Sequence, residues 1–269
     1  METLHSVIMG IVEGITEFLP VSSTGHLILT GHLLDFEKTI GSKQLGDAFE
    51  IIIQLGAILA VVAAYPGRFG RLLRLNDNRG LSGFRGLTLL AITSIPMGLL
   101  GLLLHKRIEQ HLMGRPIVVA LALAVGAIWI AAVEFRLPKA KVEGLDSMTW
   151  KEALMMGLFQ CLALWPGMSR AASTILGGMM SGVDRRTAAE YSFLAAVPVM
   201  LAATALKLSE VYRHLDPAHA RMFIIGFVVS FFVAWGTVKL FIQFLSRHTL
   251  MPFAWYRLAA AAMVIWWMA

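Results

Sequence analysis

Two polar runs interrupt an apolar sequence and hold the residues that could carry out chemistry. The first run begins with Glu13 and Glu17, which are four residues apart and would share one helix face. An ionised group at bilayer depth costs at least about 2.5–3.5 kcal/mol, so such residues are candidates for function. Like charges at this spacing repel. We therefore expect a cation, an arginine or a shared proton beside them, unless one or both lie at a water-exposed interface.

Hydroxyl residues and a histidine follow these two acids. Ser22, Ser23 and Thr24 are consecutive, and Gly25 and His26 come next. Serine and threonine often cap the helix that follows them, and a lone histidine is usually structural. Beside two carboxylates, however, the same residues offer a nucleophile and a proton carrier. The glycine would also let the backbone approach a ligand closely.

The second polar run supplies a permanent cation. It contains Gly167, Ser169, Arg170 and Thr174. A guanidinium group matches the geometry of phosphate oxygens. A helix that starts after the glycine would also aim free N–H groups at an anion. The alternative is that the arginine only neutralises one of the glutamates. Together the two runs suit chemistry on an anionic head group that is attached to an apolar tail.

The elements that position these runs must be membrane helices. The 269 residues are 57% hydrophobic and 15% charged, with a mean hydropathy of +0.71. Soluble domains have about 45–50% apolar and about 25% charged residues, so that class is excluded, as are disordered and nucleic-acid-binding chains. The net charge of +6 is typical of the basic cytoplasmic loops of membrane proteins. The only cysteine, Cys161, excludes an internal disulfide and a cysteine-based metal cluster.

Six stretches are long and apolar enough to cross a bilayer, which takes about 20 residues. They are 49–65, 87–104, 117–135, 191–206, 223–245 and 253–269. Two further apolar stretches, 7–34 and 154–180, are broken by Pro20 and Pro166. Proline interrupts a helix, and irregular backbone at membrane depth needs protein or a water-filled cavity around it. We interpret both stretches as re-entrant helix–loop–helix segments; two kinked full spans are the alternative.

The two broken segments share an order of residue types. The shared pattern is Glu13, Pro20 and Ser23 in the first segment, and Gln160, Pro166 and Ser169 in the second. Three predicted spans separate the segments, an odd number, so the second half would be inverted relative to the first. The sequence thus predicts an all-α polytopic membrane protein with a single membrane domain over 1–269. Repeat A would cover about 1–135 and repeat B about 150–269.

Both runs resemble the signatures of a known family. The segment 12–26, VEGITEFLPVSSTGH, resembles the first signature of the bacterial undecaprenyl-diphosphate phosphatases of the bacitracin-resistance type. The segment 164–174 resembles their second signature, P-G-x-S-R-S-x-x-T, and the similarity extends across essentially the whole chain. Ala171 stands where that signature has its second serine, so no essential role is expected of that hydroxyl here.

The resemblance implies what the protein does and where. It implies six spanning helices and two re-entrant pairs, related as inverted repeats. It implies hydrolysis of a C55 polyprenyl diphosphate, which recycles the lipid carrier for cell-wall synthesis and gives bacitracin resistance. It also implies a divalent cation, Mg²⁺ or Ca²⁺, with no organic cofactor. The expected partners are the polyprenyl diphosphate substrate and membrane lipid, without nucleic acid; a homodimer stays open.

The expected location is the bacterial cytoplasmic (inner) membrane, with the active site on the periplasmic or outer side. The distribution of charge agrees with a cytoplasmic position for the loops 66–85 and 136–151. These two loops hold nine lysine and arginine residues, against six in the loops of the other side. Cytoplasmic loops carry the excess of such residues.

Roles can be assigned to the matched residues as hypotheses. Ser23 is the candidate nucleophile, with Glu17 or His26 taking its proton. Alternatively His26 protonates the leaving group or activates water directly. The phosphates would be bound by Arg170, Ser169, Thr174, Ser22, Thr24 and Gly167, and the metal by Glu13 and Glu17. Glu50, Gln54 and Glu190 are further buried polar candidates.

Two other classes of function compete with a phosphatase. Inverted repeats, broken helices and carboxylates at the membrane midplane are also typical of transporters. A lipid-phosphate transporter or flippase of the inverted-repeat type is therefore the main alternative. A structural scaffold would not account for the buried acids.

Overall fold

The computed structural model describes residues 2–77, 79–112, 115–136, 140–211 and 219–268, which form helices joined by loops, with no strand among them. The long helices are α4 (Lys43–Ala64), α6 (Gly83–His111), α7 (Pro116–Phe135), α10 (Arg185–Val211), α11 (Ala220–Leu245) and α12 (Met251–Met268). The shorter ones are α1 (Glu2–Thr16), α2 (Ser23–Leu33), α3 (Phe36–Ile40), α5 (Pro66–Leu72), η1 (Leu145–Ser147), α8 (Trp150–Gln160), η2 (Cys161–Leu164) and α9 (Arg170–Met180). The predicted all-α class is confirmed.

Five helices are long and apolar enough to cross a membrane: α4, α6, α7, α10 and α11. The protein is therefore a multi-pass membrane protein. Three of these helices, α4, α6 and α10, begin four to six residues before the predicted spans, because polar residues continue each helix beyond its apolar part. In α4, for example, Ser42 caps the helix by accepting a hydrogen bond from the N–H of Leu45.

The sixth predicted span corresponds to α12, which is a helix of 18 residues but is not among those five. Arg257 stands near its middle and lowers its hydropathy. The predicted end at Ala269 lies outside the described residues. α12 packs along α7, and α11 packs along both α1 and α4.

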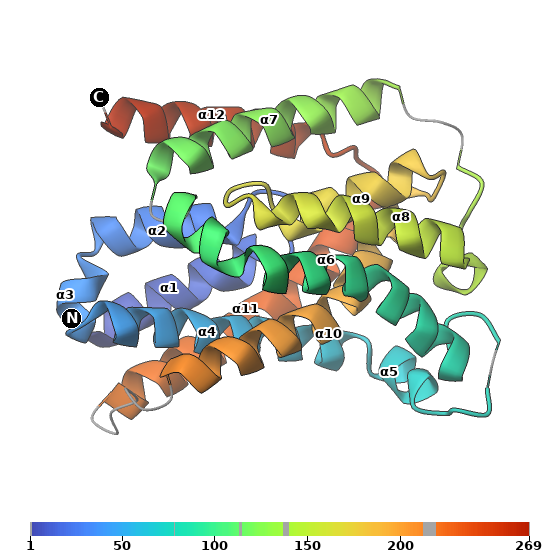
Figure 1. Ribbon diagram of the computed structural model, residues 1–269, viewed down its shortest axis with the longest axis horizontal. Coiled ribbons are helices and arrows are strands. Elements are labelled where there is room, and N and C mark those ends of the chain that lie inside the picture. Colours follow the sequence, from blue (N-terminus) through green and yellow to red (C-terminus); the bar gives the residue numbers. More distant parts are fainter. Residues whose placement is uncertain (1, 78, 113–114, 137–139, 212–218, 269) are drawn as a thin grey trace.

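Both broken segments form helical hairpins. α1 packs against α2, and α8 packs against α9, so each pair folds back on itself. At 15 and 11 residues, α1 and α2 are also short for full spans. Figure 1 shows the two hairpins approaching from opposite ends of the molecule, with their turns meeting near its middle. The predicted helix–loop–helix form is confirmed at both places, and the inverted-repeat relation and its boundaries stay predictions.

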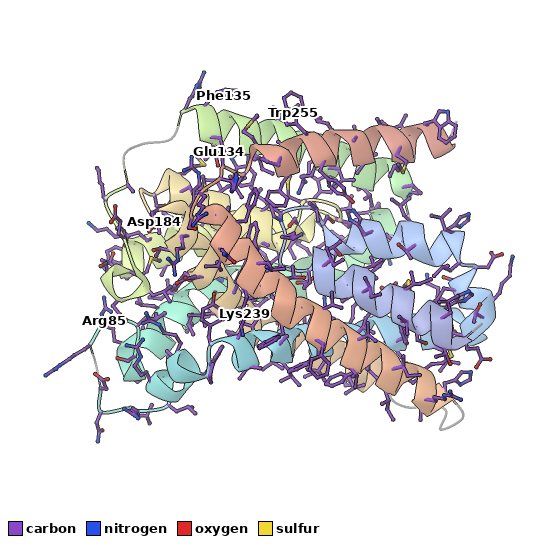
Figure 2. All side chains as sticks on the ribbon, turned by 180° about the vertical axis from the view of Figure 1, so that it is seen from behind. Arg85, Glu134, Phe135, Asp184, Lys239 and Trp255 are labelled. Carbon is purple, nitrogen blue, oxygen red and sulfur yellow. The ribbon has the colours of Figure 1, made fainter. Side chains whose placement is uncertain are left out.

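A set of polar contacts ties the helix ends on the side that holds the basic loops. Glu134, at the end of α7, forms a partly buried ion pair with Arg185 at the start of α10. The same carboxylate accepts a hydrogen bond from the N–H of Leu250, just before α12, at 2.8 Å. Figure 2 shows Glu134, Asp184 and Arg85 at this one end of the molecule. The contacts fix α7, α10 and α12 relative to one another, and α7 and α10 both pack against α9 of the second hairpin.

Candidate active site

The segment between α1 and α2, residues 17–22, is called the first turn, and the segment between η2 and α9, residues 165–169, is called the second turn. At the end of the first turn, Ser22 has a strained backbone conformation. Ser22 has a φ of 74°, which is uncommon for a residue other than glycine. Its side chain accepts a hydrogen bond from the N–H of Gly25, so it is the N-cap of α2. Ser23 therefore becomes the first helical residue. Strained residues of this kind persist only where the surrounding structure holds them, and they cluster at functional sites.

The second turn repeats the same device. Ser169 has a φ of 73°, and its side chain accepts from the N–H of Ala172 at the start of α9. Arg170 is then the first residue of its helix, as Ser23 is of α2. By cap geometry Ser169 corresponds to Ser22, whereas the sequence pattern paired it with Ser23. That pairing counted residues from the prolines, and the second turn has one more residue between proline and cap.

One carboxylate joins the two turns. The Ser23 hydroxyl donates to Oε2 of Glu17 at 2.5 Å, and Nη2 of Arg170 donates to Oε1 at 2.9 Å. The Glu17 and Arg170 side chains are only 6% and 9% exposed, so the ion pair is largely removed from water. Hydrogen bonds between ionised groups are the strong ones, and burial raises the cost of breaking them. The sequence left open whether Arg170 binds phosphate or neutralises a glutamate, and the structure shows that it is paired with Glu17.

A cavity of about 190 Å³ opens beside this carboxylate. From the first turn and the start of α2 it is lined by Glu17, Ser22, Ser23 and Thr24. From the second turn and the start of α9 it is lined by Gly167, Ser169 and Arg170, and α4 adds Gln54. The apolar part of the lining comes from Met97 of α6 with Val199, Met200 and Ala203 of α10. A polar end beside an apolar wall fits a charged head group on a hydrocarbon chain.

Other predicted site residues lie outside the lining of this cavity. The Thr174 hydroxyl donates to the carbonyl of Arg170 at 2.8 Å and lies 3.3 Å from Oε1 of Gln160, inside the protein. Glu190 accepts a hydrogen bond from Arg186 on its own helix, at 3.0 Å. Glu50 lies one turn before Gln54 on α4. Thr174 thus supports the helix that carries Arg170, and Glu190 has its own partner.

His26 is also outside the cavity lining, and both of its ring nitrogens have partners. Nδ1 lies 2.7 Å from the carbonyl oxygen of Ser22, and Nε2 lies 2.6 Å from the hydroxyl of Tyr256. A carbonyl only accepts, so Nδ1 carries the proton, and in a neutral ring Nε2 accepts from the tyrosine. This arrangement holds the backbone of the first turn. Tyr256 was missed in the sequence because it lies 230 positions away.

Glu13 is fully buried, and neither of its carboxylate oxygens has a hydrogen-bond partner among the described residues. It lies within electrostatic reach of Glu17, Glu50 and Arg170. A buried polar group without a partner is costly, so this carboxyl requires a proton or a cation. In the part of the chain that the structure describes, no three His, Cys, Asp or Glu side chains are grouped to hold a metal ion. A cation here would need oxygens from a bound ligand as well.

A second functional candidate missed by sequence reasoning is Arg257 of α12. It is fully buried and hydrogen-bonds to backbone carbonyls of both turns. The signal that could have found it was an arginine inside a predicted span, which is rare without a function.

These features define a class: a multi-pass membrane protein with a polar cavity built from two facing helical hairpins. The family model of the bacitracin resistance protein BacA matches residues 6–263, so the chain belongs to this family. An undecaprenyl-diphosphatase of Nitratidesulfovibrio vulgaris (strain Hildenborough) is 53% identical over 268 residues, which cover 100% of this chain and 99% of the relative. The undecaprenyl-diphosphatase of Oleidesulfovibrio alaskensis is 51% identical, covering 98% of each chain. The family resemblance is confirmed.

Proposed function

We propose that this protein hydrolyses undecaprenyl diphosphate to undecaprenyl phosphate and inorganic phosphate, and so recycles the lipid carrier for cell-wall synthesis. Relatives that match nearly the whole chain carry the name of this activity. The observation that carries the proposal is the Glu17 carboxylate, held between the Ser23 hydroxyl at 2.5 Å and the Arg170 guanidinium at 2.9 Å. The three residues line one cavity, which supports the roles of nucleophile for Ser23, base for Glu17 and phosphate-binding group for Arg170.

The first half of the reaction is attack by Ser23. Its oxygen forms a bond to the terminal phosphorus, while the bond from that phosphorus to the bridging oxygen breaks. The Ser23 proton passes to Glu17 and then to the leaving undecaprenyl phosphate. In the second half, water attacks the phosphoserine and gives a proton to Glu17, which returns it to the Ser23 oxygen as inorganic phosphate leaves. An adjacent base is the usual way to activate a serine nucleophile.

Arg170 binds the phosphates and stabilises charge. Among the described residues its Nε is a buried donor without a hydrogen-bond partner, which a bound phosphate would satisfy. Nη1 donates to the carbonyl of Ser192 at 3.3 Å, which fixes the plane of the guanidinium. The helix starts at Ser23 and Arg170 add free N–H groups that favour an anion. Phosphoryl transfer is catalysed mainly by such positioning and charge stabilisation.

Glu17 is a better base for Ser23 than His26. The Ser23 hydroxyl donates directly to Glu17, whereas the histidine nitrogens are bonded to Ser22 and Tyr256. We therefore assign His26 to holding the first turn. The other mechanism left open by the sequence is direct attack by water. That mechanism does not use the hydrogen bond between the Ser23 hydroxyl and Glu17.

The residues present fit a divalent cation, Mg²⁺ or Ca²⁺. Glu13 offers two buried oxygens that have no hydrogen-bond partner in the described part of the chain, and Glu17 borders the cavity. Mg²⁺ is commonly held by one or two carboxylates together with substrate phosphates. Glu13 would hold the ion together with the substrate phosphates, and when bound it would neutralise part of the charge on the diphosphate. Glu17, the second ligand expected from the sequence, is assigned here as the base instead, because its two oxygens accept from Ser23 and Arg170.

We further propose that the protein lies in the bacterial inner membrane, with the cavity accessible from the periplasmic side. The basic loops near Arg68 and Arg85 would then face the cytoplasm, as the excess of positive charge favours. The prenyl chain would leave the cavity along the apolar wall formed by α6 and α10.

The deciding experiment measures phosphate release from undecaprenyl diphosphate by the purified protein in detergent, where no membrane sidedness exists. A phosphatase releases inorganic phosphate under these conditions, and Ser23→Ala should abolish nearly all of it. The matched control is Ser181→Ala, because the Ser181 hydroxyl only donates to the carbonyl of Gly177 on its own helix. A lipid transporter releases no phosphate in detergent, and that result would contradict the proposal.

A further inference from the structure

The position of Arg257 has no explanation in the reaction described so far. It comes from α12, near the end of the chain, and it is fully buried. Among the described residues it forms no ion pair with a carboxylate, although burying an unpaired charge is expensive. The preceding residue, Tyr256, forms a hydrogen bond with His26. Trp255, one residue earlier, is 65% exposed and points outward in Figure 2. α12 therefore directs two consecutive side chains toward the hairpins.

The guanidinium of Arg257 uses all five of its N–H donors on backbone carbonyls. Nη1 donates to the first turn at Pro20, 3.1 Å, and to the second turn at Met168, 3.0 Å. Nη2 donates to Gly167 at 3.1 Å and to Ala122 of α7 at 2.9 Å. Nε donates to Leu123 of α7 at 3.2 Å. One side chain thus joins three segments that are far apart in the sequence.

The contacts to the two turns are equivalent. Pro20 lies two residues before the cap Ser22, and Gly167 lies two residues before the cap Ser169. Arg257 binds the carbonyl at this position in both turns. These carbonyls belong to interrupted helices inside the membrane, where every backbone group needs a partner. The arginine supplies it and fixes the distance between the turns at the same time.

Gly126 of α7 provides a second, independent observation. A Cβ atom added at Gly126 would lie 2.0 Å from Nη2 and 2.6 Å from Cζ of Arg257. The three nearest atoms to that position all belong to this arginine. The absence of a side chain at residue 126 is therefore what admits the guanidinium, and α7 is shaped to receive it.

From these contacts we infer that Arg257 is a positioning residue for the phosphatase reaction: it clamps the two turns so that Ser23 and Arg170 meet at Glu17. Arg257 does not line the cavity, so it acts through the backbone and not on the substrate. The inference rests on the proposed function, and wild-type phosphate release tests that function separately. A misplacement of about 1 Å in reacting groups can cost about 10²-fold in rate.

The experiment combines Arg257→Lys and Gly126→Ala in a double-mutant cycle, with kcat and KM measured on undecaprenyl diphosphate in detergent. Lysine keeps the charge but has three donors on one atom, so it cannot join five carbonyls. We expect Arg257→Lys to lower kcat by about 10-fold or more with KM changed by less than about threefold. Gly126→Ala should act similarly, because it displaces the guanidinium.

The combination separates positioning from a general loss of structure. In the Arg257→Lys background, Gly126→Ala should lower kcat little further, because the guanidinium with which the alanine Cβ collides is absent. The matched controls are Gly236→Ala, where an added Cβ meets nothing within 4 Å, and Arg247→Lys at an exposed position; both should keep wild-type kcat. A wild-type kcat for either Gly126→Ala or Arg257→Lys would overturn the inference, as would an equal cost of Gly126→Ala in both backgrounds. If Arg257→Lys does not fold, Gly126→Ala compared with Gly236→Ala decides.

Discussion

Replacing Glu17 by glutamine tests whether this carboxylate takes the proton of Ser23. The carboxylate accepts from the Ser23 hydroxyl at 2.5 Å and from Arg170 at 2.9 Å. An amide has one oxygen and one NH₂ group, and a guanidinium cannot accept a hydrogen bond. The amide oxygen should therefore turn to Arg170, and its NH₂ group should face Ser23. The hydroxyl would then accept instead of donating, and no base would receive its proton.

The expected loss of rate in Glu17→Gln follows from the contribution of a general base, which is about 10²–10⁴-fold. We expect Glu17→Gln to lower kcat by about this factor, while KM changes by less than about threefold because Arg170 keeps an oxygen partner. The variant leaves the Arg170 charge without a buried counter-charge, which costs about 3–5 kcal/mol of stability. Phosphate release should therefore be assayed well below the unfolding temperature of the variant in detergent.

The matched control is Glu152→Gln. Glu152 accepts a hydrogen bond from the N–H of Thr149 in the capping box of α8, away from the cavity, and glutamine can serve in the same position. Its kcat should equal that of the wild type. A Glu17→Gln variant with kcat within about tenfold of wild type would refute the assignment of Glu17 as the base.

Three further substitutions test other parts of the site. Arg170→Lys should lower kcat by about 10- to 100-fold in the phosphate-release assay. Lysine lacks the two parallel N–H donors of a guanidinium, and one charge-assisted hydrogen bond contributes about 1.5–3 kcal/mol. A near-normal rate would show that Arg170 does not stabilise the transition state. Glu13→Gln should raise the Mg²⁺ concentration needed for half-maximal activity, and an unchanged titration would move the ion elsewhere. Tyr256→Phe removes one hydrogen bond to His26 and should lower kcat by only about 2- to 10-fold, as one neutral bond is worth about 0.5–1.5 kcal/mol; full loss of activity would make the tyrosine catalytic.

The sequence allowed the fold and the polar turns to be predicted because these depend on local patterns. Long apolar stretches and helix-breaking prolines specify α4, α6, α7, α10 and α11 and both hairpins. The need of buried acids for a cation predicted the pairing of Arg170 with a glutamate, which the structure realises at Glu17.

What the sequence could not provide depends on contacts between distant segments. The sequence made both Glu13 and Glu17 candidate metal ligands, whereas the structure places only Glu17 beside the cavity and leaves Glu13 without a hydrogen-bond partner among the described residues. Tyr256 and Arg257 approach the turns only because α12 packs along α7. The partners of His26, Ser22 and Tyr256, also come from the fold, and its expected role toward the substrate stays a prediction.

The central claim is that Ser23 carries the phosphoryl group between the two halves of the reaction. It is tested most directly by a single turnover with undecaprenyl diphosphate labelled in its terminal phosphate, quenched in acid before completion and analysed by peptide mass spectrometry. The mechanism predicts label on Ser23, and none in the Ser23→Ala variant. Release of labelled phosphate at the wild-type rate, with no labelled protein at any time, would contradict it.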